Sequence, residues 1–156
     1  MIVVSDTSPL NYLVLIELQN ILPALFDRIL IPEAVRRELQ SPAAPELIRK
    51  WLATEPDLLE ARRVSAIDSD LAHLGPGERE AIALALSLPA GLVLLDERRG
   101  RQASREHGLA VSGTLRVLDL AARRGLIGLS DALKRLEQTT FRVTPHLLRR
   151  IRERHS

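Results

Sequence analysis

The chain has 156 residues, of which 46% are hydrophobic, and this is enough for one domain with a full apolar core. It contains no cysteine, which excludes disulfides, thiol chemistry and zinc sites built on cysteine. Because the net charge is only +2 and aromatic residues make up 3%, the chain is not a polycation, and base stacking is not its main way of binding a nucleic acid.

The sequence carries no signal for a membrane or for export. Its apolar runs are shorter than the ~18 residues of a membrane span, and no basic segment precedes the apolar start, as it would in a signal peptide. We therefore expect a cytoplasmic protein that does not enter a membrane. Since no repeat, low-complexity segment or long linker divides the chain, we expect residues 1–156 to form a single domain.

The first eight residues set the pattern for the rest of the chain. Residues 2–4 are a short apolar, β-branched run that predicts a strand buried on both faces. The run stops at Asp6, and the next residues, Thr7, Ser8 and Pro9, are typical of a helix start. Because ligands bind at the carboxyl ends of strands in an open parallel sheet, Asp6 would stand at the mouth of a site. The alternative is that Asp6 only caps the following helix.

Apolar periodicity and Gly/Pro breaks predict strands and helices that alternate along the chain. Strands are predicted over residues 2–4, 28–31, 58–64, 92–95 and 109–111. Helices are predicted over residues 9–18, 21–26, 32–39, 46–53, 67–74, 78–88, 98–107, 114–124, 130–138 and 144–154. This order predicts an α/β fold, a single α/β/α sandwich in which helices cover both faces of a parallel sheet of four or five strands.

Acidic residues recur at equivalent places in this pattern. Asp6 and Asp96 each end an apolar strand, and Glu38 lies in the helix after the second strand. Glu78 begins the helix behind a Gly-Pro-Gly break, and Glu80 follows two residues later. Strand ends and the starts of the following helices gather at one edge of a parallel sheet, so we expect these carboxylates to meet. Carboxylates that meet repel one another and need cations.

Oxygen ligands of this kind predict Mg²⁺ or Mn²⁺ as the cofactor. Such ions can activate water and stabilise the transition state of phosphodiester cleavage. Each acid also has a simpler interpretation: Glu38 as a solvated helix residue, Glu78 and Glu80 as favourable charges at a helix N-terminus, and Asp96 as a cap. Other chemistries fit poorly, because the sequence has no phosphate-binding loop, no nucleophile elbow and no metal-ligand spacing among its histidines.

The positive charge is mostly arginine and occurs in clusters. One cluster directly follows Asp96 and contains Arg98, Arg99 and Arg101. Arginine makes bidentate contacts with phosphate, so we predict that these three residues bind the backbone of a nucleic acid rather than its bases. A solvated helix face is the alternative for any single cluster.

The order of these motifs resembles that of the PIN-domain family, in the branch of small prokaryotic ribonucleases typified by VapC-like toxins. The resemblance covers roughly residues 1–125, and residues 126–156 would add helices to this core. It rests on the stretches VVSDTSPL, PEAVRREL, GEREAIALA, LLDERRGR and GLAVSGTLRVLDL. It implies an α/β/α sandwich, a Mg²⁺ or Mn²⁺ site of three or four acids, and cleavage of single-stranded RNA. It also often implies a homodimer and a small antitoxin partner.

Four positions match the family pattern directly. Asp6, Glu38 and Asp96 match its first, second and last acids, and Ser8 matches a small hydroxyl residue beside the first acid. One departure follows the last acid, where the chain has Glu97 rather than a second aspartate two residues on. A further ligand at that place is therefore not implied.

The third acid is either Glu78 or Glu80. Glu78 has the better spacing to Asp96, whereas Glu80 directly precedes the apolar AIALA run, as the acid of the family often does. Either choice places a glutamate where the family more commonly has an aspartate, which would alter the geometry around the metal.

From these residues and the resemblance we predict a metal-dependent endoribonuclease that cleaves single-stranded RNA, as the toxin of a toxin–antitoxin pair. Two alternatives use the same features. The first is a PIN-like module without activity that binds RNA or a protein, against which the intact acid set argues. The second is a metal-dependent phosphatase or DNA nuclease, because the metal chemistry does not distinguish the sugar.

The predicted last helix, residues 144–154, is amphipathic. Leu147, Leu148 and Ile151 fall on one stripe that has to be buried against the domain itself, a second copy or an antitoxin. We expect this helix to serve packing or dimerisation, and the acid cluster to be the surface that an antitoxin inhibits.

Overall fold

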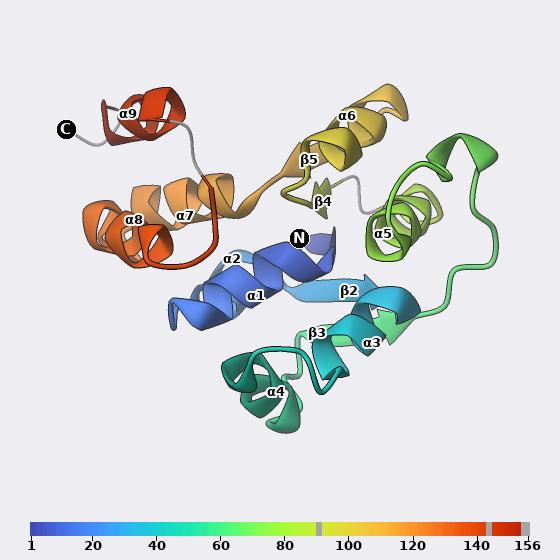
Figure 1. Ribbon diagram of the computed structural model, residues 1–156, viewed down its shortest axis with the longest axis horizontal. Helices are drawn as coiled ribbons and strands as arrows, with labels where there is room; N and C mark the ends of the chain where they lie inside the picture. Colours follow the sequence, from blue (N-terminus) through green and yellow to red (C-terminus); the bar gives the residue numbers. More distant parts are fainter. Residues whose placement is uncertain (90–91, 143–144, 154–156) are drawn as a thin grey trace.

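A five-stranded parallel sheet forms the centre of the computed structural model, which describes residues 1–89, 92–142 and 145–153 (Figure 1). The strands are β1 (Ile2–Ser5), β2 (Arg28–Pro32), β3 (Leu59–Arg62), β4 (Leu92–Leu94) and β5 (Ala110–Ser112). They lie in the order β3-β2-β1-β4-β5, and every neighbouring pair is parallel. The predicted fold class is therefore confirmed.

Helices connect these strands largely as the sequence predicts. They are α1 (Thr7–Leu15), α2 (Ile21–Leu25), α3 (Glu33–Gln40), α4 (Glu46–Ala53), α5 (Pro76–Leu86), α6 (Arg98–Glu106), α7 (Thr114–Arg123), α8 (Leu129–Glu137) and α9 (Pro145–Glu153). The predicted ends of the last helix, Thr144 and Arg154, lie outside the described residues. None of the helices described is long and apolar enough to cross a membrane.

Two predicted helices differ from the structure. The helix predicted over residues 67–74 is wrong, because this segment forms only a 3₁₀ turn, Ser69–Leu71. The Asp68 carboxylate accepts a hydrogen bond from the Asp70 backbone N–H, which favours a local turn over a helix. The first helix ends at Leu15 instead of Leu18, because Glu17 has a φ of 58° and closes the helix in a left-handed cap.

Apolar side chains pack on both faces of the sheet. On one face Val3 and Leu94 belong to the main core with residues of α1, α2, α7 and α8. On the other face Val4 and Val93 pack with residues of α5 and α6. Because neighbouring residues of one short strand face opposite layers, the central strands β1 and β4 carry consecutive buried apolar residues, as expected for strands that helices cover on both sides.

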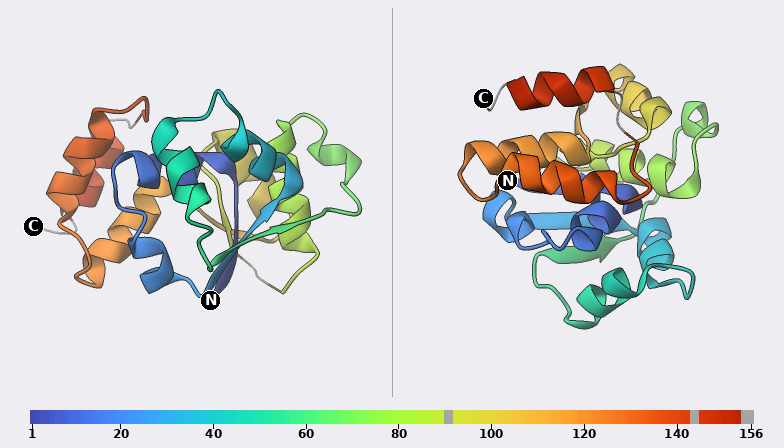
Figure 2. Two further views of the ribbon diagram at one scale, coloured as in Figure 1. Left: turned by 90° about the horizontal axis from the view of Figure 1, so that it is seen from below. Right: turned by 60° about the vertical axis from the view of Figure 1, so that its left-hand side comes forward.

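Helix α9 packs on its own domain. It lies over α7 and α8 in two views of the molecule (Figures 1 and 2). Ile151 is buried in the main core, and Leu148 packs against that core. The Arg152 guanidinium and the Glu137 carboxylate, 3.2 Å apart, form an ion pair that links α9 to α8. The apolar stripe of the last helix therefore contributes to packing.

The topology also fixes where a site can form. The chain passes from β1 outward to β2 and β3, and then returns to the other side of β1 to form β4 and β5. The strand order thus reverses between β1 and β4, which are joined past Ser5 by a hydrogen bond of 2.9 Å from the Asp6 backbone N–H to the Leu94 carbonyl. In open parallel sheets a ligand crevice lies outside the carboxyl ends of the strands at such a reversal.

Replacing Ile151 by alanine tests the packing of α9. We expect the free energy of unfolding to fall by about 2 kcal/mol or more, because the substitution leaves a cavity beside the core. Leu147→Ala, on the same helix but 38% exposed, is the matched control and should cost less than half as much. Urea unfolding at two protein concentrations measures both. A loss that appears only at high protein concentration would indicate that Ile151 packs against a second copy instead.

Candidate active site

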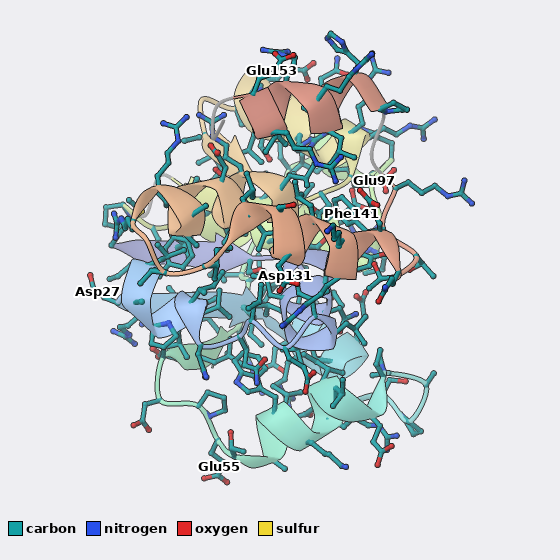
Figure 3. The ribbon with its side chains drawn as sticks, turned by 90° about the vertical axis from the view of Figure 1, so that its left-hand side faces the viewer. Asp27, Glu55, Glu97, Asp131, Phe141 and Glu153 are labelled. Atoms are coloured by element: carbon teal, nitrogen blue, oxygen red, sulfur yellow. The ribbon has the colours of Figure 1, made fainter. Side chains whose placement is uncertain are left out.

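Four of the predicted acids line one cleft at the carboxyl edge of the sheet. The cleft has a volume of about 670 Å³ and lies at the ends of β1 and β4. Its acids are Asp6, Glu38, Glu78 and Asp96. Glu97 and Phe141 also line it and lie near each other in Figure 3. The structure therefore brings together residues that come from four separate segments of the chain.

Asp6 lies at the base of the cleft. It is 7% exposed and occupies the N-cap position of α1, but its side chain makes no capping hydrogen bond. Burial raises the pKa of Asp6 from 3.8 to about 7, an effect that the Thr7 backbone N–H opposes and that the charges of Glu78, Glu38 and Asp96 increase. The interpretation of Asp6 as a simple helix cap therefore has no support in the structure.

Gly77 allows the first two acids to approach each other. A Cβ atom at this position would lie 2.8 Å from Asp6 Oδ1 and 3.2 Å from Glu38 Oε1, so a larger residue would push these carboxylates out of their positions. Glu38 is exposed on α3, and its carboxylate accepts a hydrogen bond from the Thr7 hydroxyl. The Gly-Pro-Gly break is thus more than a helix start, because its second glycine packs directly against two carboxylates.

Glu78 supplies the third acid of the cleft. Its Oε2 atom is buried and has no hydrogen-bond partner among the described residues. Burial raises the pKa of Glu78, and the charges of Glu97 and Glu38 raise it further, while His73 lowers it. A buried carboxylate oxygen without a partner is unfavourable unless a ligand satisfies it.

Glu80 has a different role. Its Oε1 atom accepts a hydrogen bond of 3.2 Å from the Ala34 backbone N–H, in the first turn of α3. It therefore satisfies one of the N–H groups that a helix leaves unpaired at its start, and it does not line the cleft. Of the two candidates for the third acid, the structure places Glu78 with the other acids and Glu80 away from them.

Asp96 is fixed by hydroxyl groups. Its Oδ2 atom accepts hydrogen bonds from the Ser8 hydroxyl at 2.8 Å and the Thr114 hydroxyl at 2.7 Å. Its Oδ1 atom accepts one from the Thr114 backbone N–H at 2.6 Å. A Cβ atom at Gly113 would lie 2.8 Å from Asp96 Oδ1, so this approach requires glycine.

Ser8 thus lies beside an acid, as predicted, although its partner is the last acid rather than the first. Thr114 is a site residue that sequence reasoning missed. The sequence pattern did point to it, because Gly113 follows the end of β5 and Thr114 is the first residue of α7. This is the same kind of position, at the end of a strand and the start of a helix, that marked the acids.

The three predicted arginines occupy different positions. Arg98 and Arg101 line the cleft. Arg99 is exposed on α6 and does not line it. The structure therefore places two of the three beside the acids.

The acid cluster fits a hard divalent cation. Within the described residues none of the four carboxylates forms an ion pair, although burial raises the pKa of Asp6 and the charges of the other three acids raise it further. The Oε2 atom of Glu78 has no hydrogen-bond partner among the described residues, so it is available to bind a metal ion. Carboxylate oxygens without competing nitrogen or sulfur ligands suit Mg²⁺ or Mn²⁺. The residues present are therefore able to hold the cofactor that the sequence predicts.

A second group of potential ligands lies at the other end of α6. His107 Nε2 is 3.3 Å from Asp70 Oδ2 and 3.9 Å from Asp68 Oδ2, so these three residues could hold a metal ion. The hydrogen bond with the Ala103 carbonyl raises the pKa of His107, and the two aspartates raise it further. An imidazolium paired with two carboxylates accounts for this arrangement without a metal.

Calorimetric titration with Mn²⁺ tests the acid cluster. We expect Asp6→Asn and Glu78→Gln to weaken Mn²⁺ binding about tenfold or more, because each removes a charged oxygen ligand. Glu80→Gln is the control from the same helix and should leave the affinity unchanged. His107→Ala reveals any binding at the second group. Equal Mn²⁺ binding by the wild type and Asp6→Asn would contradict the assignment.

The raised pKa of Asp6 predicts a pH-dependent stability of the metal-free protein. Below pH ~4 Asp6 is protonated in both the folded and the unfolded chain. Between its ordinary value of 3.8 and about 7, only the unfolded chain ionises, so the free energy of unfolding falls as pH rises and then levels off. At 1.36 kcal/mol per pKa unit, the total loss is about 4 kcal/mol.

Asp6→Asn removes this loss. In urea unfolding with EDTA, its stability advantage over the wild type should grow by about 3 kcal/mol between pH 5 and pH 8. Asp57→Asn changes an exposed carboxylate that forms no ion pair with a described residue, and it serves as the control. An Asp6→Asn advantage of the same size at both pH values would show that burial does not perturb Asp6.

Comparisons with known proteins agree with this fold. A family model described as a PIN domain matches residues 2–156, which include all four acids and both C-terminal helices. No curated protein matches the chain. A solved structure, a PilT N-terminus domain protein from the hyperthermophilic archaeon Sulfolobus solfataricus P2, is similar in fold, with a TM-score of 0.51 and 13% sequence identity over 92% of this chain and 100% of that one. Because the family match spans nearly the whole sequence, the chain belongs to the PIN-domain family.

Proposed function

We propose that the protein is a Mg²⁺- or Mn²⁺-dependent endoribonuclease that cleaves the phosphodiester bonds of single-stranded RNA. PIN domains are generally nucleases, so family membership supports a hydrolase of phosphodiester bonds. The observation that carries the proposal is the meeting of four carboxylates in one cleft, among them a buried oxygen without a partner. A module that only bound RNA or protein would gain nothing from holding four mutually repelling carboxylates in one cleft.

The roles of the residues follow from their contacts. Asp6, Glu38 and Glu78 would hold the cation together with Asp96. Such an ion, when bound, lowers the pKa of water and stabilises the negative charge that develops on the phosphate. Burial raises the pKa of Asp6 to about 7, so part of the metal-free protein carries a proton on this carboxyl at neutral pH and releases it when a cation binds.

The neighbouring residues hold the carboxylates and the substrate in place. The hydroxyls of Ser8 and Thr114 fix both oxygens of Asp96 together with the Thr114 backbone N–H. Arg98 and Arg101 line the same cleft, and their guanidinium groups suit a phosphate held for in-line attack. The reaction requires the phosphate to be held in position and its negative charge to be neutralised, and side chains held in fixed positions can do both.

We further infer a role as the toxin of a toxin–antitoxin pair in the VapC-like branch, acting as a cytoplasmic homodimer. Among the described residues none of the four acids forms an ion pair, even with Arg98 and Arg101 in the same cleft, which supports inhibition by an arginine that a small antitoxin inserts there. Co-expression with the product of a small neighbouring reading frame tests this. We expect that product to block cleavage by the wild type and to lose affinity for Asp6→Asn.

A cleavage assay tests the proposed activity. We expect the wild type to cut single-stranded RNA with Mg²⁺ or Mn²⁺ and to stop with EDTA. Asp6→Asn and Asp96→Asn should reduce the rate by about 10²-fold or more, because each loses a charge that supports the transition state. Glu80→Gln should cut at the rate of the wild type.

The same assay separates the alternatives. Cutting of single-stranded DNA in preference to RNA would point to a DNA nuclease. Release of phosphate from a small monoester, without cutting of either polymer, would point to a phosphatase. RNA binding with no cutting in either metal would contradict the nuclease proposal and support a binding module.

A further inference from the structure

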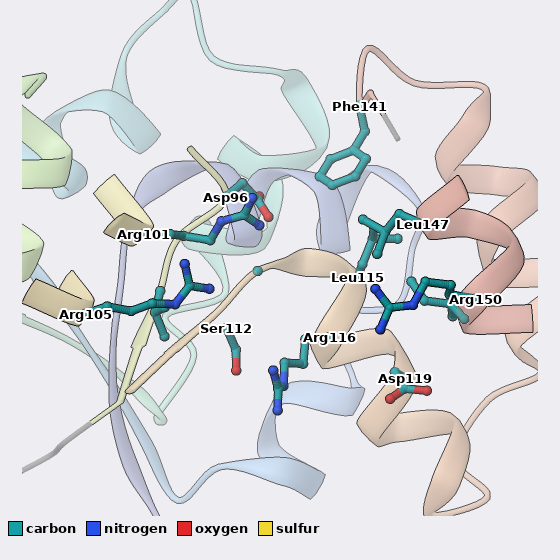
Figure 4. Close-up of a pocket in the computed structure, with 13 residues that line it drawn as sticks. Asp96, Arg101, Arg105, Ser112, Leu115, Arg116, Asp119, Phe141, Leu147 and Arg150 are labelled. Atoms are coloured by element: carbon teal, nitrogen blue, oxygen red, sulfur yellow. The ribbon is translucent and has the colours of Figure 1, made fainter. Parts of the chain in front are cut away.

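A second cavity adjoins the acid cleft. It has a volume of about 230 Å³ and shares Asp96, Arg101 and Phe141 with the cleft, so the two spaces meet at the last acid. Its other walls come from β5, α7 and α9 (Figure 4). The cavity therefore extends the cleft toward the C-terminal helix.

Four arginines line this cavity, and we call it the arginine pocket. Arg101 and Arg105 come from α6, Arg116 from α7 and Arg150 from α9. Arg105 and Arg150 extend into the space from opposite sides (Figure 4). The pocket thus collects arginines from three separate helices.

These four side chains are not used for internal ion pairs. Elsewhere several arginines bind a carboxylate, as Arg36 binds Glu33 and Arg135 binds Asp131. Within the part of the chain that the structure describes, no arginine of the pocket has such a partner. Their mutual repulsion therefore favours an anion from outside the chain.

The two carboxylates of the pocket, Asp96 and Asp119, offset only part of the charge of its four arginines. Asp96 accepts hydrogen bonds from the hydroxyls of Ser8 and Thr114. Asp119 lies 3.3 Å from the Arg123 guanidinium on its own helix. The pocket thus keeps an excess of positive charge where it meets the cleft.

The shape and chemistry of the pocket favour a nucleotide. Arginine binds phosphate through two parallel hydrogen bonds, and Leu115 and Leu147 provide apolar wall for a sugar or base. The volume is below the roughly 300–1,000 Å³ of pockets for drug-sized ligands, so a folded protein segment does not fit inside. In a polynucleotide, phosphates recur along the strand, and a strand whose phosphate lies at the acids brings its next one to an adjoining pocket.

We propose that the arginine pocket binds the nucleotide next to the cleaved phosphodiester bond, with Arg105, Arg116 and Arg150 around its phosphate. This inference rests on the proposed RNA substrate. It makes α9 part of the substrate path as well as of the core, since Arg150 lines the pocket and Ile151 both packs in the core and forms part of the pocket wall. Arg101, which lines both spaces, contacts the strand between them.

RNA binding without metal tests the pocket separately from catalysis. Fluorescence anisotropy of a labelled single-stranded RNA of about twelve nucleotides is measured in EDTA at several salt concentrations. We expect Arg105→Ala and Arg150→Ala each to weaken binding about tenfold. The slope of log affinity against log salt should also become shallower, by ~0.7 for each lost phosphate contact.

Each variant has a matched control on the same helix. Arg99→Ala on α6 and Arg149→Ala on α9 remove equal charges from positions that line neither space, although the sequence predicts a phosphate contact for Arg99. Both controls should stay within about twofold of the wild type, because a side chain outside both spaces contributes only a screened charge and no direct phosphate contact. Thermal melting verifies folding, and Arg105→Lys and Arg150→Lys, which keep the charge but lose the bidentate contact, should fall between wild type and alanine.

The outcomes separate the pocket from the proposed function. Binding by the pocket variants equal to that of their controls, with an unchanged salt slope, would overturn the pocket and leave the nuclease proposal intact. If these variants bind RNA as tightly as their controls but bind an acidic protein less tightly, the pocket binds that protein instead of RNA, and the pocket proposal is likewise overturned. If the pocket variants bind RNA more weakly but the wild type cuts no RNA with metal, the pocket proposal stands and the nuclease proposal is overturned. A wild type that binds no RNA at low salt would overturn both.

Discussion

The structure depends on how the fold holds four carboxylates close together against their repulsion. The sheet places Asp6 and Asp96 at the ends of adjacent strands, and α3 and α5 bring Glu38 and Glu78 to the same cleft. The raised pKa of Asp6 is the physical mark of this constraint, because a buried acid among like charges resists ionisation. Such an arrangement lowers the stability of the metal-free protein and becomes favourable when a cation binds.

Close backbone approach makes the cluster possible. Gly77 lies against two carboxylates and Gly113 against a third, at positions where a Cβ atom would displace the carboxylate oxygens. Hydroxyls also hold the carboxylates, as those of Ser8 and Thr114 do for Asp96 Oδ2. The charge next to the cluster changes sign within a short distance, since the arginine pocket begins at Asp96. A polyanionic strand needs both parts, one to receive the cleaved phosphate and one to hold its neighbour.

The sheet and three of the acids could be predicted because they depend on local patterns. Apolar runs such as residues 92–95 mark strands, and an acid that ends such a run lies at the functional edge. Tertiary contacts decided the rest. Glu78 lines the cleft, whereas the Glu80 carboxylate accepts a hydrogen bond from the Ala34 backbone N–H on another helix. The left-handed cap at Glu17 could not be predicted, because such a cap is normally recognised by a glycine and this one is formed by a glutamate. The arginine pocket gathers residues of α6, α7 and α9, whose proximity no single stretch of sequence contains.

The position of a bound metal tests the central claim most directly. Crystals of the protein grown with Mn²⁺ give an anomalous signal that locates the ion without any assumption about activity. We expect a peak in the cleft, in contact with carboxylate oxygens of Asp6 and Glu78 among the four acids. A cleft without a peak at saturating Mn²⁺, or a peak found solely at Asp68, Asp70 and His107, would contradict the account.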